Sequence, residues 1–258
     1  MKHPSYTNTA GYLRRIAEDT SWLEEHYSSI ESNVDNRLLF LSLSGSHVYG
    51  FPDEASDFDL RGCHIDDMRA VLSLHPGNQT HEKMYELDGR KVDYVTHEVK
   101  KFLLLMITPN GNILEQVYSP FTLYEHPLFE DVKTIAAKCI TKKLYNHYYG
   151  FSQHMIHHCR DDAKKRNRKD IEYCYRTLLA GRYVLENGSF EHNLYTLCDY
   201  YDVAINKVYP FKDFDSMLVD LKKAQEESKL PIDSNVYEEA NNLLINIRNI
   251  LRQEEGQE

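Results

Sequence analysis

The stretch LLFLSLSGSHVYGFPDEASDFDLRGCHI, residues 38–65, decides how this chain folds. Its opening run is mainly apolar and ends at Gly45-Ser46, a pattern that favours a buried strand followed by a tight turn and a short helix. After a loop, the residues from Asp57 onward alternate as a second strand would. Because alternate residues of a strand point to the same face, we expect Asp57 and Asp59 to stand side by side.

A third carboxylate follows in a comparable setting. Asp88-Gly89 is a typical hairpin turn, and residues 91–96 after it alternate as a strand should. If this strand lies beside the first carboxylate strand, Asp93 converges with Asp57 and Asp59. Carboxylates at such short distances repel one another. A divalent cation such as Mg²⁺, which prefers oxygen ligands, relieves the repulsion. A solvent-facing acidic strand pair is the simpler alternative.

Together these segments resemble the sequence signature of a known protein superfamily. Gly45-Ser46, followed by Asp57-Phe58-Asp59 and later by Val92-Asp93-Tyr94, resembles the signature of the DNA polymerase β nucleotidyltransferase superfamily. That signature is a Gly-Ser turn after a strand, an acidic-hydrophobic-acidic triplet, and a later acidic residue between hydrophobic ones. The three parts together are specific, although each alone is weak.

The resemblance narrows to one family. Residues 45–50 and 56–62 are similar to the stand-alone "predicted nucleotidyltransferase" family, which includes the RlaP proteins found with RNA-ligase systems. A less sharp match extends through residues 173–182. The family implies transfer of an NMP from an NTP to an acceptor hydroxyl or phosphate, with release of pyrophosphate. RNA is the expected acceptor; a small-molecule or protein acceptor, including a toxin-type reaction, and a nucleotide-binding regulatory module are the alternatives.

The resemblance also assigns roles to residues. Asp57, Asp59 and Asp93 are the expected catalytic residues and the ligands of Mg²⁺ or Mn²⁺. Gly45 and Ser46 are expected to bring backbone N–H groups and a hydroxyl to the β- and γ-phosphates. Taken without the carboxylates, the same turn reads as an ordinary strand-to-helix connection capped by a serine.

Cationic residues supply further candidates for nucleotide binding. Arg61 falls on the carboxylate face by alternation, where it could orient a carboxylate, reach a phosphate or form a structural ion pair. Residues 164–169 form the one dense basic cluster, which could bind a triphosphate or an RNA backbone or could simply be a solvated helix face. The candidates beyond the Gly-Ser turn are Arg61, Lys164, Arg168, Lys169 and Arg176. A nearby run from His154 to Cys159 looks metal-like, but surface histidines are its simpler interpretation.

The bulk composition bounds the class of protein. With 258 residues, 41% hydrophobic and 27% charged, the chain can bury a substantial core. A net charge of −10 argues against wrapping nucleic acid over the whole surface. The 5 cysteines lack CxxC spacing, and neither a membrane span nor a signal peptide is evident, so we expect reduced thiols and a cytoplasmic location. The preferred base and the oligomeric state are not indicated.

The predicted architecture is α+β. A small mixed α/β nucleotidyltransferase domain resembling polymerase β, with an N-terminal helix, is expected over residues 1–127, and an all-helical domain that closes the cleft over residues 128–258. The expected strands are 38–43, 57–65, 82–87 and 90–96, and the expected helices are 9–27, 98–107, 131–163, 168–187, 191–204, 213–228 and 235–253. Breaks are expected at Gly150, Gly188, Pro210 and Pro231. Residues 112–117 fit either a strand or a helix.

Overall fold

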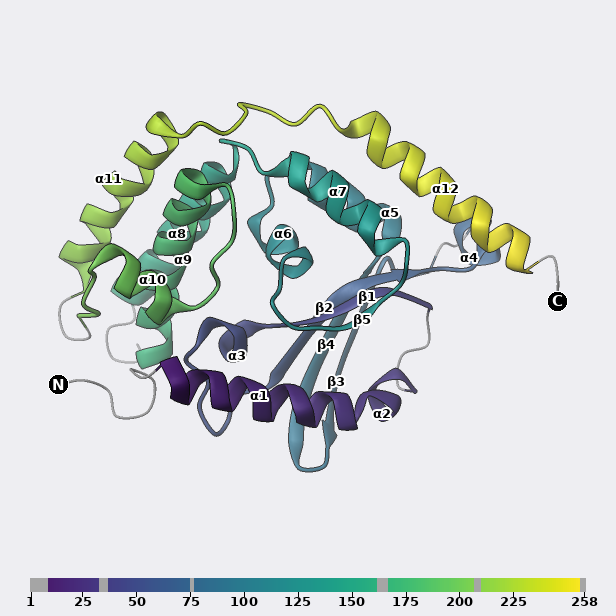
Figure 1. Ribbon diagram of the computed structural model, residues 1–258, viewed down its shortest axis with the longest axis horizontal. Helices are drawn as coiled ribbons and strands as arrows, with labels where there is room; N and C mark the ends of the chain where they lie inside the picture. The colour runs from purple at the N-terminus through teal and green to yellow at the C-terminus, as the bar shows by residue number, and fades with distance from the viewer. Residues whose placement is uncertain (1–8, 33–36, 75–76, 162–166, 207–209, 256–258) are drawn as a thin grey trace.

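One mixed sheet with helices around it forms the first half of the chain in the computed structural model (Figure 1). The structure describes residues 9–32, 37–74, 77–161, 167–206 and 210–255. The strands are β1 (Arg37–Ser44), β2 (Phe58–Ile65), β3 (Thr80–Leu87), β4 (Arg90–Glu98) and β5 (Thr122–Glu125), and their order in the sheet is β3-β4-β2-β1-β5. Strands β2 and β4 run parallel, and the other neighbouring pairs run antiparallel.

Helices cover both faces of the sheet and make up most of the second half. They are α1 (Thr9–Glu25), α2 (Tyr27–Glu31), α3 (Gly45–Tyr49), α4 (Met68–Leu72), α5 (Val99–Ile107), α6 (Gly111–Val117), α7 (Phe129–Cys139), α8 (Leu144–Asp161), α9 (Arg168–Asn187), α10 (Leu194–Tyr201), α11 (Phe211–Glu227) and α12 (Tyr237–Glu255). Among the described residues, no helix combines the length and the apolar character needed to cross a membrane.

Aromatic contacts show how the helices dock on the sheet. On one face, Trp22 of α1 stacks on Phe58 of β2, with ring centroids 5.0 Å apart. On the other face, Phe40 of β1 contacts Phe102 of α5 at 5.3 Å and Phe129 of α7 at 4.3 Å. Such pairs combine a large buried apolar area with a preferred geometry, so they fix each helix as well as stabilise it.

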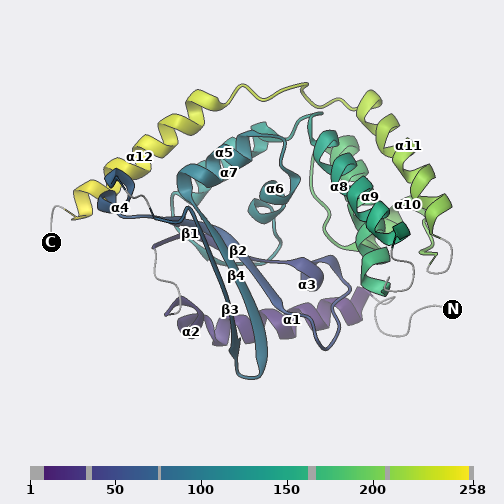
Figure 2. The ribbon, with the colours of Figure 1, turned by 180° about the vertical axis from the view of Figure 1, so that it is seen from behind.

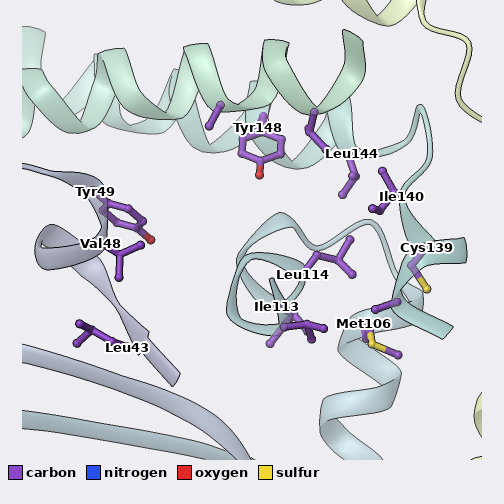
Figure 3. Close-up of a cluster of buried hydrophobic side chains, with 14 of the residues drawn as sticks. Leu43, Val48, Tyr49, Met106, Ile113, Leu114, Cys139, Ile140, Leu144 and Tyr148 are labelled. Atoms are coloured by element: carbon purple, nitrogen blue, oxygen red, sulfur yellow. The ribbon is translucent and has the colours of Figure 1, made fainter. Parts of the chain in front are cut away.

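The second half is built around α9, which packs against α8, α10 and α11. Helix α12 instead returns to the first half and packs on α5 and α7, as Figure 2 shows from behind. Buried side chains join the two halves: Leu43 and Tyr49 face a cluster that continues through Leu114 of α6 to Tyr148 of α8 (Figure 3). The hydrophobic core is therefore continuous from the sheet to the helices.

The α+β prediction is confirmed, with local corrections. The single helix expected over residues 131–163 is two helices, and the break predicted at Gly150 is wrong because α8 runs through that residue. The break lies at residues 140–143, where Lys142 N donates to the main-chain oxygen of Pro231 at 2.9 Å. A glycine costs a helix only about 1 kcal/mol relative to alanine, so packing overrides it.

Two further segments gain an assignment. Residues 112–117, left open from the sequence, belong to a helix, and the side chain of Asn110 caps its start by accepting from Ile113 N. Strand β5 was not expected. It is only four residues long, a length at which alternation carries little signal.

Candidate active site

A cation and two carboxylates meet where β2 and β4 run side by side. Asp59 of β2 and Asp93 of β4 are register partners on these parallel strands. Arg61 Nη2 donates to Asp59 Oδ1 and to Asp93 Oδ2, at 2.7 Å in each case. Its Nη1 donates to the main-chain oxygen of Asp93, also at 2.7 Å. The guanidinium therefore lies between the two carboxylates, where opposite charge is needed.

The electrostatics of Asp59 reflect this crowding. Burial raises the pKa of its carboxyl above the ordinary value, Arg61 opposes that shift, and Asp93 adds to it. Asp57 raises the same pKa further, although less strongly. Groups whose ionised form is penalised by burial and by like charges are typical of functional sites, because a bound cation relieves both penalties.

The Gly-Ser turn lies directly against this group. Gly45 has a φ of 68°, a left-handed conformation that favours glycine. A Cβ at this position would lie 1.8 Å from Asp59 Oδ2, so only glycine fits between the turn and the carboxylate. Ser46 follows in α3 and is buried. The structure thus brings Gly45 and Ser46 next to the carboxylates, as the motif implied.

Asp57 lies at the rim of the group. It comes immediately before β2, is half-buried, and lines a cavity of about 460 Å³. The cavity is bounded by α1, by the loop before β2 and by the β3–β4 hairpin, and His47 and Arg90 also line it.

The expected convergence of all three carboxylates is therefore not seen. Asp59 and Asp93 meet at Arg61, whereas Asp57 faces this cavity, and the three do not bring ligand atoms to within 4.8 Å of one another. The reason is that β2 begins at Phe58, so Asp57 lies in the loop before the strand and does not follow its alternation.

A buried histidine beside the site escaped the sequence analysis. His47 of α3 hydrogen-bonds through Nδ1 to Asp19 Oδ2 of α1 at 2.7 Å, and its ring stacks on Phe58 at 4.4 Å. Its Nε2 is buried and has no hydrogen-bond partner. The histidine could have been noticed inside the Gly45–Gly50 segment, but nothing in the sequence marks Asp19 among the charged residues of α1.

One residue of the basic cluster predicted at positions 164–169 contacts the loop beside the candidate site. Lys169, at the start of α9, donates to Ser56 Oγ at 2.7 Å and pairs with Asp53 Oδ1 at 3.0 Å. It therefore contacts the loop that precedes Asp57. Arg168 pairs instead with Glu172, with Nε and Oε1 2.7 Å apart. Lys164 lies outside the described residues.

Arg176 lies in the core behind the Gly-Ser turn. Its Nη2 pairs with Glu115 Oε2 of α6 at 2.5 Å, and its guanidinium lies 3.8 Å from the ring centroid of Tyr49. Tyr148 donates to the other oxygen of Glu115 at 2.6 Å. Arg176 is only 3% exposed, so its visible role is to tie α9 to α6 and α3. The metal-like residues His154 and His158 are exposed on α8.

Comparison with known proteins identifies a family whose model matches most of the chain. Residues 20–231 match the family described as "RlaP: RNA repair pathway DNA polymerase beta family". An uncharacterized protein of Methanocaldococcus jannaschii is 34% identical over 202 residues, which cover 78% of this chain and 80% of that protein. A solved structure of a nucleotidyltransferase-like protein from Exiguobacterium sibiricum aligns with a TM-score of 0.32 and 13% identity, over 79% of this chain and 74% of that one.

Proposed function

The chain belongs to the RlaP family of DNA polymerase β-type nucleotidyltransferases associated with RNA repair, and from that premise we propose that it transfers an NMP from an NTP to an RNA hydroxyl or phosphate. Pyrophosphate is the second product. The observation that carries the proposal is the convergence of Asp59 and Asp93 on one cationic nitrogen beside the Gly45 turn. Both carboxylates are only 26% exposed, unlike those of a solvent-facing acidic strand pair.

The donor set fits the divalent metal that the superfamily typically uses. Carboxylate oxygens are the ligands that Mg²⁺ and Mn²⁺ prefer, and Asp59 and Asp93, which already share one cationic partner, would hold the ion, with Asp57 as the third candidate ligand. The Arg61 guanidinium already marks a position where Asp59 and Asp93 bind positive charge. When bound, the ion would neutralise phosphate charge and make the acceptor hydroxyl more acidic.

The protein's own groups bind the triphosphate and accept the proton of the acceptor. The backbone N–H groups of the turn at Gly45 and the hydroxyl of Ser46 bind the β- and γ-phosphates and orient the triphosphate. Asp93 accepts the proton of the acceptor hydroxyl. Arg61 offsets one of the two carboxylate charges in this structure, and on substrate binding it would turn toward a phosphate.

Residues around the site position these groups. His47, held by Asp19, fixes α3 against α1, and thereby fixes the Gly-Ser turn. Arg176 supports the same helix from the other side through Tyr49, so we assign it a positioning role and keep Lys169 and Arg168 as the candidates for contact with nucleotide or RNA.

The two halves divide the task. We propose that residues 1–127 form the nucleotidyltransferase unit and residues 128–258 the helical unit. Because α7 and α12 pack on the first half, the helices that would close over nucleotide and acceptor are α8 to α11. Support comes from Lys169, which reaches from α9 to the loop before Asp57. A small-molecule or protein acceptor is the second candidate, favoured by the net charge of −10.

Labelling with NTPs tests the reaction and the acceptor together. The purified chain is incubated with each NTP radiolabelled at the α-phosphate, with Mg²⁺ or Mn²⁺ and with total cellular RNA; Asp59→Asn is the control. Label in RNA with the wild type alone supports the proposal. Label in a protein band or a small molecule moves the acceptor to that class. Binding of nucleotide without any transfer overturns the catalytic function in favour of a regulatory module.

A further inference from the structure

A second group of ligand atoms lies at the other end of β2. His64 of β2, Asp66 just after that strand, and His81 of β3 each bring one ligand atom to within 4.8 Å of the others. The rings of His64 and His81 stack with centroids 4.3 Å apart. Because β4 lies between β2 and β3 in the sheet, the two histidines lean toward each other over β4.

The buried histidine of this group, His64, has a hydrogen bond at one ring nitrogen but none at the other. His64 is 0% exposed, and its Nδ1 lies 2.8 Å from Thr96 Oγ1 of β4. Its Nε2 is buried without a hydrogen-bond partner, 3.5 Å from Asp66 Oδ1. Buried polar atoms are nearly always satisfied, so an imidazole nitrogen with a carboxylate 3.5 Å away and no hydrogen bond is well placed to take a shared ligand.

The surroundings support coordination through that nitrogen. A metal-binding histidine usually donates its other ring N–H to a protein oxygen, which fixes both tautomer and ring orientation. Thr96 Oγ1 provides that oxygen for His64. Arg248 of α12 donates to the main-chain oxygen of Asp66 at 3.1 Å, and this contact holds the third ligand in place.

We propose that His64, Asp66 and His81 bind a transition-metal dication of the Zn²⁺ class, with water completing the coordination. Two imidazole nitrogens and one carboxylate are a set that Zn²⁺ binds and that Mg²⁺, which prefers oxygen ligands, does not favour. The site is separate from the proposed carboxylate site: His64 follows Asp59 by five residues on β2, about 17 Å along the strand, and points to the opposite face.

The bound ion would stabilise the edge of the sheet. Strand β3 is an edge strand, bonded only to β4 among the described strands. Coordination by His64 and His81 would cross-link it to the central strand β2. Since β4 carries Asp93 and lies between them, the cross-link would stiffen the strand that presents that carboxylate.

Metal titration of the full chain tests the site. After treatment with a chelator, Zn²⁺ or Co²⁺ is titrated in excess Mg²⁺, which occupies the oxygen-ligand site. The expected results are one equivalent bound per chain, a rise in melting temperature, and visible absorption bands typical of four-coordinate Co²⁺. His81→Ala and Asp66→Asn should each weaken binding by more than the roughly 10–100-fold that loss of a supporting partner causes, and Thr96→Val by about that range.

The double variant His154→Ala/His158→Ala is the matched control, since it removes an exposed pair of histidines on α8 and should leave the titration unchanged. Equal affinity of wild type and His81→Ala, or no saturable binding to wild type, would overturn the proposal. Asp66→Asn preserves the shape of its side chain and provides the decisive comparison should His81→Ala fail to fold. None of these readouts depends on nucleotidyl transfer, so the proposed function and this site can fail separately.

Discussion

Asp59 and Asp93 face each other across two parallel strands, and both bind the same nitrogen of Arg61. In this state the protein supplies its own cation to a pair of carboxylates that are only about a quarter exposed, at 26% of each side chain. A metal ion must therefore compete with a built-in positive charge.

Removing Arg61 should make the carboxylate pair dependent on Mg²⁺. In Arg61→Met, the two carboxylates repel each other, and we expect a loss of about 1–3 kcal/mol in the free energy of unfolding without metal. Mg²⁺ should restore much of this loss, because the ion takes over the neutralising role. Arg182→Met is the control, since Arg182 also contacts two carboxylates, those of Glu186 and Asp220. Equal Mg²⁺ effects on the melting temperatures of both variants would contradict the prediction.

Gly45 should tolerate no side chain. Gly45→Ala forces a Cβ into the left-handed region and against Asp59 Oδ2. Gly89 provides the control, because its φ of 73° imposes the same backbone strain of about 1–2 kcal/mol, while nothing lies within 4 Å of the added atom. We expect Gly45→Ala to unfold at lower denaturant concentration than Gly89→Ala and to lose nucleotidyl transfer. Similar denaturation midpoints for the two variants, with nucleotidyl transfer intact in both, would refute the close fit between Gly45 and Asp59.

Arg176 should matter for folding more than any exposed arginine. Arg176→Met leaves Glu115 buried without its cationic partner, which typically costs about 3–5 kcal/mol. Arg160→Met, which breaks an exposed pair with Asp215, should cost less than about 1 kcal/mol. Adding Glu115→Gln to Arg176→Met should recover part of the loss, since it removes the unpaired charge. Urea unfolding checks all three variants, and a double variant no more stable than the single one would argue against the ion pair as the cause.

Lys169 should contribute to binding of polyanions. Lys169→Glu reverses a charge beside the loop before Asp57, so we expect weaker binding of NTP or RNA, with a smaller dependence of affinity on salt. Lys138→Glu is the control, because Lys138 lies on α7 in an exposed pair with Glu239. Fluorescence anisotropy with labelled RNA at several salt concentrations measures both effects. Identical salt slopes for the two variants would remove Lys169 from the interface.

Local patterns in the sequence predicted the strands that carry Asp59 and Asp93. Strand alternation placed Asp59 correctly, and the hairpin signal at Asp88-Gly89 located the strand of Asp93. In the structure, Asp88 has a φ of 47° and Gly89 a φ of 73°, as expected for that turn. Pairing between the two carboxylates then required only that β2 and β4 be neighbours. These inferences succeeded because a period of two residues fixes which face each side chain occupies.

Tertiary contacts decided what the sequence left open. Arg176 is a phosphate candidate from the sequence because it lies in residues 173–182, which resemble the family. Only the contact between α9 and α6 reveals its partner Glu115, 61 residues away in sequence. The break at residues 140–143 likewise rests on a bond from Lys142 to Pro231. Asp19 and His47 meet only because α1 docks beside α3. No pattern within a short window carries such information.

The position of α12 has a consequence for how the protein is made. Arg248 pairs with Glu98, 150 residues earlier, and Glu98 is only 4% exposed in the finished fold. A ribosome adds about 5–20 residues per second, so Glu98 waits roughly 8–30 seconds for its partner to be synthesised. During that interval the carboxylate of Glu98, at the end of β4, accepts a hydrogen bond from Lys100 N but lacks its cationic partner. Newly made chains should therefore stay open to chaperones and proteases until α12 docks.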